Sequence, residues 1–275
     1  SNNQGTYSIA IGNITALNTQ GSSSIALGNY AGQDNQGDDA IAIGHYSGQL
    51  NQGQTSIAIG KESGKNSQGI SSIAIGLQAG QTNQSDDAVA IGDLAGQTNQ
   101  GTNSIAIGYE AGTDNQGADS IAIGIDAGAI VQGTSSVAIG NQAGQSTQGS
   151  YSVAIGFQAG QNTQENNSIA IGYQAGQFAQ LNQSIAIGEL AGQYDQRYLS
   201  IAIGSQSAVY SQGEYSVALG QYSANTGQGT YSIAIGTEAA STDQKDNAIS
   251  VGYLAGNYSQ GNSSIAIGKE SAQIS

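Results

Sequence analysis

The branched aliphatic residues of this chain recur in pairs, and each pair encloses one small residue and precedes a glycine. The segment Ser-Ile-Ala-Ile-Gly at residues 8–12 returns as Ser-Ile-Ala-Leu-Gly at 24–28 and recurs with a period of 16 up to 264–268. This spacing gives 17 copies without an insertion or a deletion. The consensus is S-I-A-I-G-x-x-A-G-Q-x-N-Q-G-x-x, and we number its columns 1 to 16 from the serine. A fixed period of this kind indicates an array of stacked structural units.

The alternation within each repeat predicts strands. Columns 1 to 5 alternate small and branched residues, which is the two-residue period of a β-strand. Helical repeats need about 33 to 47 residues, so the period of 16 excludes them. A second strand is expected at columns 8 to 13, and the polar residues of columns 14 to 16 predict a return turn. The sequence therefore predicts an all-β fold: a parallel β-solenoid, or β-roll, of about 17 coils in a single array over residues 1–275.

Glycine occupies column 5 in every repeat, where it predicts a turn. A positive φ or a close approach of two backbones is possible there because glycine has no Cβ atom. The residues expected in this role include Gly12, Gly28, Gly44, Gly60, Gly76, Gly92 and Gly108.

Glutamine occupies column 13 in every repeat that reaches it. Stacked amides can form a ladder in which each side chain bonds the one in the next coil. Alternatively, each glutamine caps a turn carbonyl in its own coil. The column consists of Gln20, Gln36, Gln52, Gln68, Gln84, Gln100, Gln116, Gln132, Gln148, Gln164, Gln180, Gln196, Gln212, Gln228, Gln244 and Gln260.

The aliphatic residues of columns 2 and 4 allow two arrangements. They can fill the coil interior against the column 8 alanines, or they can point outward and leave only small residues inside. The sequence has no third large apolar column to complete a private core, so we favour the outward arrangement and association of chains along an aliphatic stripe. Representative core or interface residues are Ile57, Ile59, Ile105, Ile107, Ile121, Ile123, Ile169 and Ile171.

Composition narrows the possible functions. The chain has 5 basic and 19 acidic residues and a formal charge of −14, which argues against binding to nucleic acid. It has no cysteine and one histidine, His45, so disulfides, thiolate metal sites and a repeated catalytic histidine are excluded. No apolar run approaches the length of a membrane-spanning helix. We expect no enzymatic activity, no cofactor and no metal site, and we interpret the acidic residues near the turns as solvated rather than as calcium ligands.

Tyrosines are the best candidates for ligand contact, because an exposed tyrosine offers an apolar ring and a polar tip. Tyr109, Tyr173 and Tyr253 share column 6, whereas Tyr194 and Tyr210 share column 11. The alternative is that these rings only shield turns and grooves between chains.

Residues 200–208 (SIAIGSQSA) and 216–224 (SVALGQYSA) resemble the head repeats of trimeric autotransporter adhesins, and related strings occur in phage and giant-virus fibres. The resemblance extends over essentially the whole chain. It implies a left-handed parallel β-roll, three chains packed around an axis through the aliphatic face, and display at a cell or virion surface. It also implies binding to a host or matrix protein or glycan.

The sequence thus predicts an extracellular structural and adhesive fibre segment that forms a homotrimer. One alternative is a self-assembling filament with a purely mechanical role. A third is an ice-binding solenoid, which requires the small residues of columns 1 and 3 to be exposed. Neither end shows a cap: residues 1–5 begin within a repeat and 273–275 stop within another, so we expect the parent protein to continue or the ends to stack.

Overall fold

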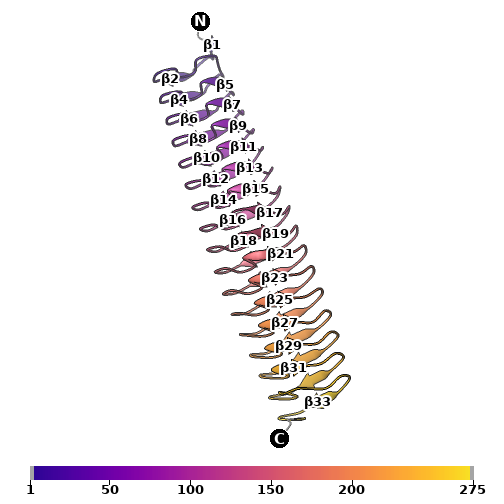
Figure 1. Cartoon of the computed structure of the whole chain (residues 1–275). Helices are drawn as coiled ribbons and strands as arrows, with labels where there is room; N and C mark the ends of the chain where they lie inside the picture. The colour runs from indigo at the N-terminus through magenta and orange to yellow at the C-terminus, as the bar shows by residue number, and fades with distance from the viewer. Residues whose placement is uncertain (1–2, 273–275) are drawn as a thin grey trace. The chain divides into compact units, whose positions relative to one another are not determined.

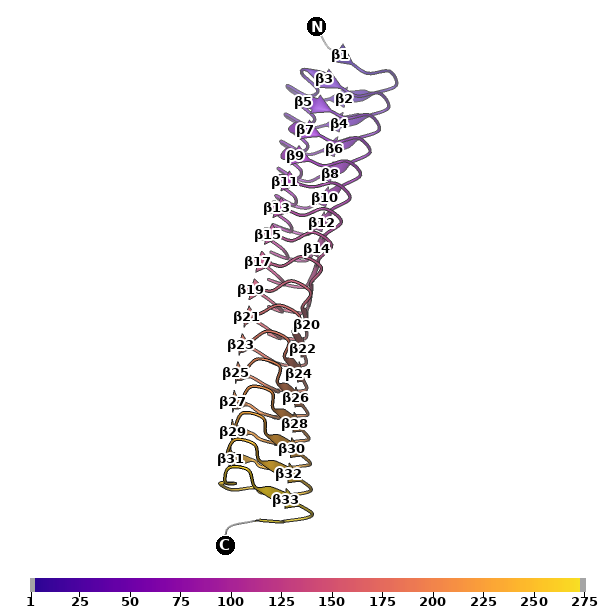
Figure 2. The same cartoon turned by 90° about the vertical axis from the view of Figure 1, so that its right-hand side faces the viewer.

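The computed structural model describes residues 3–272, and most coils contribute two short parallel strands (Figures 1 and 2). Columns 2 to 4 form one sheet, which we call the aliphatic sheet. Columns 11 to 13 form the other, which we call the glutamine sheet. The all-β parallel solenoid expected from the sequence is confirmed. Residues 1–2 and 273–275, on which the expectation of uncapped ends partly rests, lie outside the described residues.

The chain divides into two compact units, residues 1–136 and 137–275, which are described separately. In the first unit the aliphatic sheet comprises β2 (Ile9–Ile11), β4 (Ile25–Leu27), β6 (Ile41–Ile43), β8 (Ile57–Ile59), β10 (Ile73–Ile75), β12 (Val89–Ile91), β14 (Ile105–Ile107) and β16 (Ile121–Ile123). Its glutamine sheet comprises β1 (Asn3–Gln4), β3 (Thr19–Gln20), β5 (Asp34–Gln36), β7 (Leu50–Gln52), β9 (Asn66–Gln68), β11 (Thr82–Gln84), β13 (Thr98–Gln100), β15 (Asp114–Gln116) and β17 (Val131–Gln132).

The second unit repeats this organisation. Its aliphatic sheet comprises β18 (Val137–Ile139), β20 (Val153–Ile155), β22 (Ile169–Ile171), β24 (Ile185–Ile187), β26 (Ile201–Ile203), β28 (Val217–Leu219), β30 (Ile233–Ile235), β32 (Ile249–Val251) and β33 (Ile265–Ile267). Its glutamine sheet comprises β19 (Thr147–Gln148), β21 (Asn162–Gln164), β23 (Phe178–Gln180), β25 (Tyr194–Gln196), β27 (Tyr210–Gln212), β29 (Thr226–Gln228) and β31 (Thr242–Gln244).

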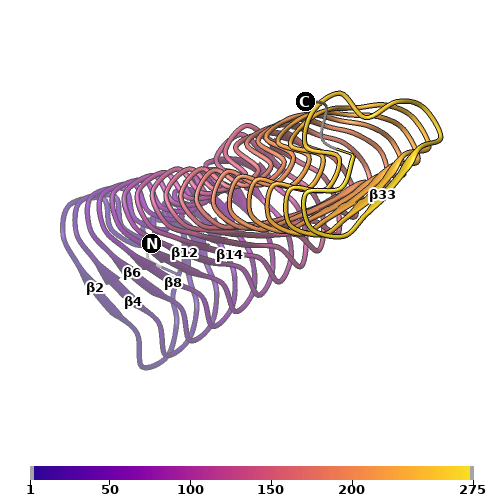
Figure 3. The ribbon, with the colours of Figure 1, turned by 90° about the horizontal axis from the view of Figure 1, so that it is seen from below.

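The register between coils equals the sequence period. Ile73 pairs with Val89 and Ala74 with Ala90, so each pair joins the same column of two consecutive repeats. Viewed from below, neighbouring coils within a unit follow similar outlines (Figure 3). Each column of the sequence is therefore a row of stacked side chains, so a one-residue insertion would displace every row that follows it.

The second strand is shorter than expected, because it begins at column 11 and not at column 8. Columns 6 to 9 form a turn instead. In the coil of residues 88–103, φ is +60° at Leu94 and +52° at Gly96, and residues in this left-handed region cannot continue a strand. Alanine at column 8 still faces the interior, but it does so from a turn.

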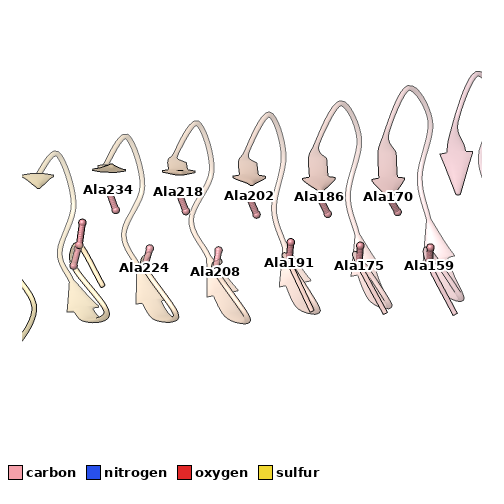
Figure 4. Close-up of a cluster of buried hydrophobic side chains, with 12 residues drawn as sticks. Ala159, Ala170, Ala175, Ala186, Ala191, Ala202, Ala208, Ala218, Ala224 and Ala234 are labelled. Atoms are coloured by element: carbon pink, nitrogen blue, oxygen red, sulfur yellow. The ribbon is translucent and has the colours of Figure 1, made fainter. Parts of the chain in front are cut away.

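Apart from the column 13 glutamine, the interior of the coils contains small side chains. In the second unit, Ala170, Ala186 and Ala202 of the aliphatic sheet point toward Ala175 and Ala191 of the column 6 to 9 turns, and all are fully buried (Figure 4). The first unit has the same arrangement, with Ala26 and Ala42 in one buried cluster with Ala31. Since alanine is the largest apolar residue that fits this space, the branched aliphatic residues must lie on the outer face of the sheet. Of the two arrangements that the sequence left open, the structure has the second.

Column 5 is a position of very close approach between coils. Gly92 has a φ of +133°, and a Cβ atom on it would lie 2.3 Å from the carbonyl oxygen of Gly108 in the next coil. For the other column 5 glycines, the distance from such a Cβ to the carbonyl oxygen of the next column 5 glycine in the same unit would be 2.2 to 2.6 Å. These atoms belong to the backbone, so a side chain at this column would separate the coils. Among residues 3–272, no helix is long and apolar enough to cross a bilayer.

We expect Gly92→Ala to lower the free energy of unfolding by about 3 kcal/mol or more, because it combines a disfavoured φ with a backbone clash. Gly96→Ala in the same coil is the matched control. Its Cβ would meet side chains rather than backbone, namely the end of Gln100 and, at 3.2 Å, the Cβ of Ala90, and alanine already occupies this column at Ala208 and Ala224. It should cost about 1 kcal/mol or less. Urea denaturation of both variants measures the difference, and equal losses would contradict the close-approach argument.

Candidate functional site

The column 13 glutamines cross the interior from one sheet to the other. Gln100 is fully buried, and its Nε2 donates to the carbonyl oxygen of Val89 in the aliphatic strand of the same coil at 2.7 Å. A longer contact of 3.4 Å reaches the carbonyl oxygen of Ser104 in the next coil. The shorter bond recurs at 2.7 to 2.9 Å from Gln20 to Gln260. The amide therefore holds the two sheets of each coil at a fixed separation.

The same amides also form a ladder along the axis. Gln84 Nε2 donates to Gln100 Oε1 at 3.1 Å. The Oε1 atoms of Gln68 and Gln84 receive no hydrogen bond, so the ladder is interrupted there. Both roles considered from the sequence thus occur, but the carbonyl that is bound lies in a strand and not in a turn. Further ladder contacts join Gln36–Gln52, Gln116–Gln132, Gln148–Gln164, Gln164–Gln180, Gln212–Gln228, Gln228–Gln244 and Gln244–Gln260.

Serine at column 1 is another buried polar group whose hydrogen bond is local. Ser104 Oγ donates to the carbonyl oxygen of Gly101 at 2.6 Å, and Ser232 Oγ donates to that of Gly229 at the same distance. These serines are fully buried, as are the column 3 alanines from Ala26 to Ala234. The small-residue face on which the ice-binding alternative depends is therefore inside the coil.

The outer face of the aliphatic sheet is a continuous apolar stripe within each unit. In β14, Ala106 is fully buried, whereas Ile105 and Ile107 on either side are only partly buried. Some side chains of the stripe are more exposed, with Leu27 and Leu219 each at 41%. The predicted core or interface residues Ile57, Ile59, Ile105, Ile107, Ile121 and Ile123 lie on this face in the first unit, and Ile169 and Ile171 lie on it in the second.

The predicted ligand-contact tyrosines do not form a single patch. Tyr109, Tyr173 and Tyr253 lie in the turns that follow column 5, at exposures of 48%, 50% and 47%. Tyr194 and Tyr210 lie in the glutamine sheet instead, in β25 and β27. Different elements therefore carry the two groups, and any ligand that touches one group need not reach the other.

Several aromatic rings stack along the columns. Phe178, Tyr194 and Tyr210 form a row with centroids 5.1 and 5.3 Å apart and nearly parallel planes. Tyr215 stacks on Tyr231 at 4.9 Å. Partial desolvation by neighbouring groups raises the pKa of Tyr215, and electrostatic interactions with Tyr231, Tyr198 and Glu214 raise it further. Hydrogen bonding to Glu110, with its charge, raises the pKa of Tyr109. The raised pKa keeps the hydroxyl groups of Tyr109 and Tyr215 protonated at physiological pH.

A second amide network, which the sequence analysis missed, joins columns 7 and 10. In the second unit, Gln158 Nε2 donates to Gln142 Oε1 at 2.8 Å, and Gln174 Nε2 donates to Gln158 Oε1 at 2.7 Å. Gln177 and Gln193 of column 10 join the same network and are almost fully buried. The signal was present in the sequence, since glutamine stands at both columns in three consecutive coils.

In the first unit a carboxylate takes part in this network. Glu62 accepts hydrogen bonds from Gln78, Gln81 and Lys65. Burial alone would raise the pKa of Glu62, but the Gln78 hydrogen bond and the positive charge of Lys65 outweigh it and lower the pKa. This glutamate is held as an anion by its neighbours.

Acidic residues at column 15 cap the backbone of the preceding coil. The N–H of Ser22 donates to Asp38 Oδ1 at 2.7 Å, and that of Ile70 donates to Asp86 Oδ1 at 2.7 Å. Some of the acidic residues near the turns are therefore not only solvated but also accept hydrogen bonds from the backbone of the preceding coil. Among residues 3–272, no three His, Cys, Asp or Glu side chains converge as metal ligands do.

Cavities in both units recur at columns 12 to 15, where the glutamine sheet meets the return turn. One in the first unit is lined by Asn51, Ser67, Gly69, Asn83 and Asp86, among others. The second unit has one around Gly149 and Glu165, and a further one between Arg197 and Asn262. A corner groove at columns 12 to 15 therefore occurs in several coils of both units.

The repeats match a known family. The YadA head domain repeat (2 copies) matches residues 100–127, 116–143, 132–159, 198–223 and 228–255. These segments cover less than half of the chain and include residues of both units. No curated protein matches the chain. The resemblance to the heads of trimeric autotransporter adhesins is thus confirmed over the matched residues, and the family is one of adhesins rather than of enzymes.

We expect Gln100→Met to lower the free energy of unfolding by about 1 to 3 kcal/mol, because it leaves the buried Val89 carbonyl without its amide partner. Gln97→Met removes an amide from the partly buried outer network and should cost no more than about 0.5 kcal/mol. The urea concentrations at which the two variants are half unfolded measure this difference. Equal losses, or a stabilised Gln100→Met variant, would contradict the role assigned to the column 13 amide.

Proposed function

We propose that this chain is a structural and adhesive segment of a surface fibre, which forms a homotrimer through the aliphatic stripe and displays its variable turns to ligands. The YadA head domain match indicates an adhesin-like segment exposed at a surface. The observation that carries the assembly is the orientation of columns 2 and 4, which point away from the interior in every described coil. A host or matrix protein, or a glycan, is the proposed ligand.

The physical argument for assembly is the exposed apolar area. Soluble monomers rarely expose a contiguous apolar patch larger than a few hundred Å². Here the stripe runs through all the described coils of each unit, and its branched side chains are at most partly buried. A partner chain that presents the same stripe would remove this surface from water and contribute about 25 cal/mol per Å² buried.

The alternatives receive less support. A purely mechanical filament uses the same stripe but needs no ligand, and no described feature favours it over adhesion. Ice binding depends on the serine and alanine face, which is buried in the coils. The extracellular location follows from the adhesin family and stays part of the proposal.

We expect Ile107→Asp to dissociate the assembly, because it places a charge in the desolvated centre of the stripe. Analytical ultracentrifugation should give a wild-type mass of three times 27.5 kDa and a smaller species, or an unfolded chain, for the variant. Ile130→Asp is the matched control. Ile130 is 52% exposed in the loop before β17, and its column already carries Asp114.

Ile130→Asp should retain the wild-type mass and melting temperature. An unchanged mass and melting temperature for Ile107→Asp would overturn the interface. A wild-type chain that stays a monomer would do the same, whereas long polymers would favour the mechanical filament.

A further inference from the structure

The aliphatic stripe is bordered on both sides by columns with exposed residues. Column 6 follows the turn glycine of column 5, and column 16 precedes the serine of column 1, so the two columns lie at opposite edges of the aliphatic sheet. Large apolar residues at both edges are about half exposed, for example Tyr109 of column 6 at 48% and Tyr231 of column 16 at 58%. A chain that covers the stripe would therefore meet these edges as well.

The residues at the two edges complement each other within each repeat. No repeat that contains both columns carries a large apolar residue at both of them, or two charges of the same sign. Where column 6 is large and apolar, column 16 is polar: Leu77 with Asp87, Tyr109 with Asp119, Ile125 with Ser135, Phe157 with Asn167, Tyr173 with Gln183 and Tyr253 with Ser263. The reverse holds for Asn141 with Tyr151, Glu189 with Leu199, Ser205 with Tyr215 and Gln221 with Tyr231.

The adjacent register between the two columns lacks this property. If each column 6 residue met column 16 of the preceding repeat, Asp93 would meet the like charge of Asp87. In the same-repeat register Asp93 meets Asn103 instead. The Asn103 amide donates one N–H to Asp119 Oδ1 at 3.0 Å and has a second N–H to donate. Because like charges that face each other across an interface cost free energy, the charges favour the same-repeat register.

The symmetry of an assembly decides which edges meet. In a cyclic assembly of parallel chains, the column 6 edge of one chain lies against the column 16 edge of the next. In an antiparallel twofold pair, each column would instead lie against the same column of the partner. A pattern that relates column 6 to column 16 is therefore the one expected for parallel chains.

We propose that columns 6 and 16 form a side contact between neighbouring copies of this chain, in which each column 6 residue lies against the column 16 residue of the same repeat in the next copy. Every tyrosine of these pairs then meets a residue that can hydrogen-bond its hydroxyl group. The proposal rests on the assembly proposed above and adds its register. Tyr109, Tyr173 and Tyr253 then contact a chain rather than a ligand, whereas Tyr194 and Tyr210 of the glutamine sheet stay exposed.

Disulfide crosslinking of the full chain tests this contact, because the chain has no cysteine of its own. The double variant Tyr109→Cys/Asp119→Cys places one thiol at each edge of the same repeat. Within one chain these thiols cannot bond, because the strand between the edges is about 15 Å long and a disulfide needs Cα atoms within about 7 Å. Mild oxidation should therefore link neighbouring chains into a covalent trimer of three times 27.5 kDa on a non-reducing gel.

The matched control is Tyr109→Cys/Asp87→Cys. It removes the same carboxylate from the same column, but its second thiol lies two coils away, about 10 Å along the solenoid axis. It should give no covalent trimer, and neither should Tyr109→Cys or Asp119→Cys alone. Column 16 has a left-handed backbone that already accepts Thr55 and Leu199, so cysteine fits there.

Ser205→Cys/Tyr215→Cys repeats the test in the second unit and gives a second result if the first double variant does not fold. The proposal is overturned if neither double variant forms covalent trimers, or if the Asp87→Cys control crosslinks as readily as the Asp119→Cys pair. It is also overturned if the single variants form covalent dimers, because an antiparallel pair brings each column against itself.

The mass of the unoxidised wild type separates this test from the test of assembly. A wild-type trimer in the ultracentrifuge whose double variants do not crosslink would leave the aliphatic interface in place and remove only the edge contact. A wild-type monomer would remove both.

Discussion

Consecutive coils approach each other very closely at the column 5 glycines, where a Cβ atom would lie 2.2 to 2.6 Å from the next carbonyl oxygen. This contact requires every coil to have the same length and the same turn, because any change would lift one coil from the next. The parallel pairing of both sheets in steps of one repeat follows from it. The rows of stacked side chains, on which every other feature depends, exist only while this register is kept.

Because the coil is narrow, its large apolar side chains lie on the outside. Its interior accepts alanine and serine, and the one long side chain inside is an amide that spans from sheet to sheet. The branched aliphatic residues are therefore on the outside, where a single chain covers them only in part. Most globular proteins bury such residues within the chain, whereas this solenoid presents them in the position where a second chain can bury them. Folding and assembly are thereby linked in the proposed fibre.

The residue type varies at columns whose side chains are not needed for the stacking of coils, and the coils differ from one another mainly at these columns. Aromatic residues gather at columns 6, 11 and 16, and the residues that line the corner groove differ from coil to coil. Stacking gives such local variation a regular spacing, because equivalent residues of adjacent coils lie one strand apart, about 4.8 Å. Tyrosines at the same column of consecutive repeats thus become a row of parallel rings.

The sequence by itself determined the period, the two parallel sheets, the column 5 turn and the importance of the column 13 glutamine, because strict repetition reports what each coil requires. It could not determine which face of the alternating strand lies inside, since Ser-Ile-Ala-Ile-Gly permits either. The closeness of the two sheets, which admits Ala106 but not Ile107, decided this in the tertiary structure. The same applies to the left-handed turn at columns 6 to 9, the glutamine network of columns 7 and 10 and the corner groove at columns 12 to 15. Each depends on contacts between coils, and those contacts exist only after stacking.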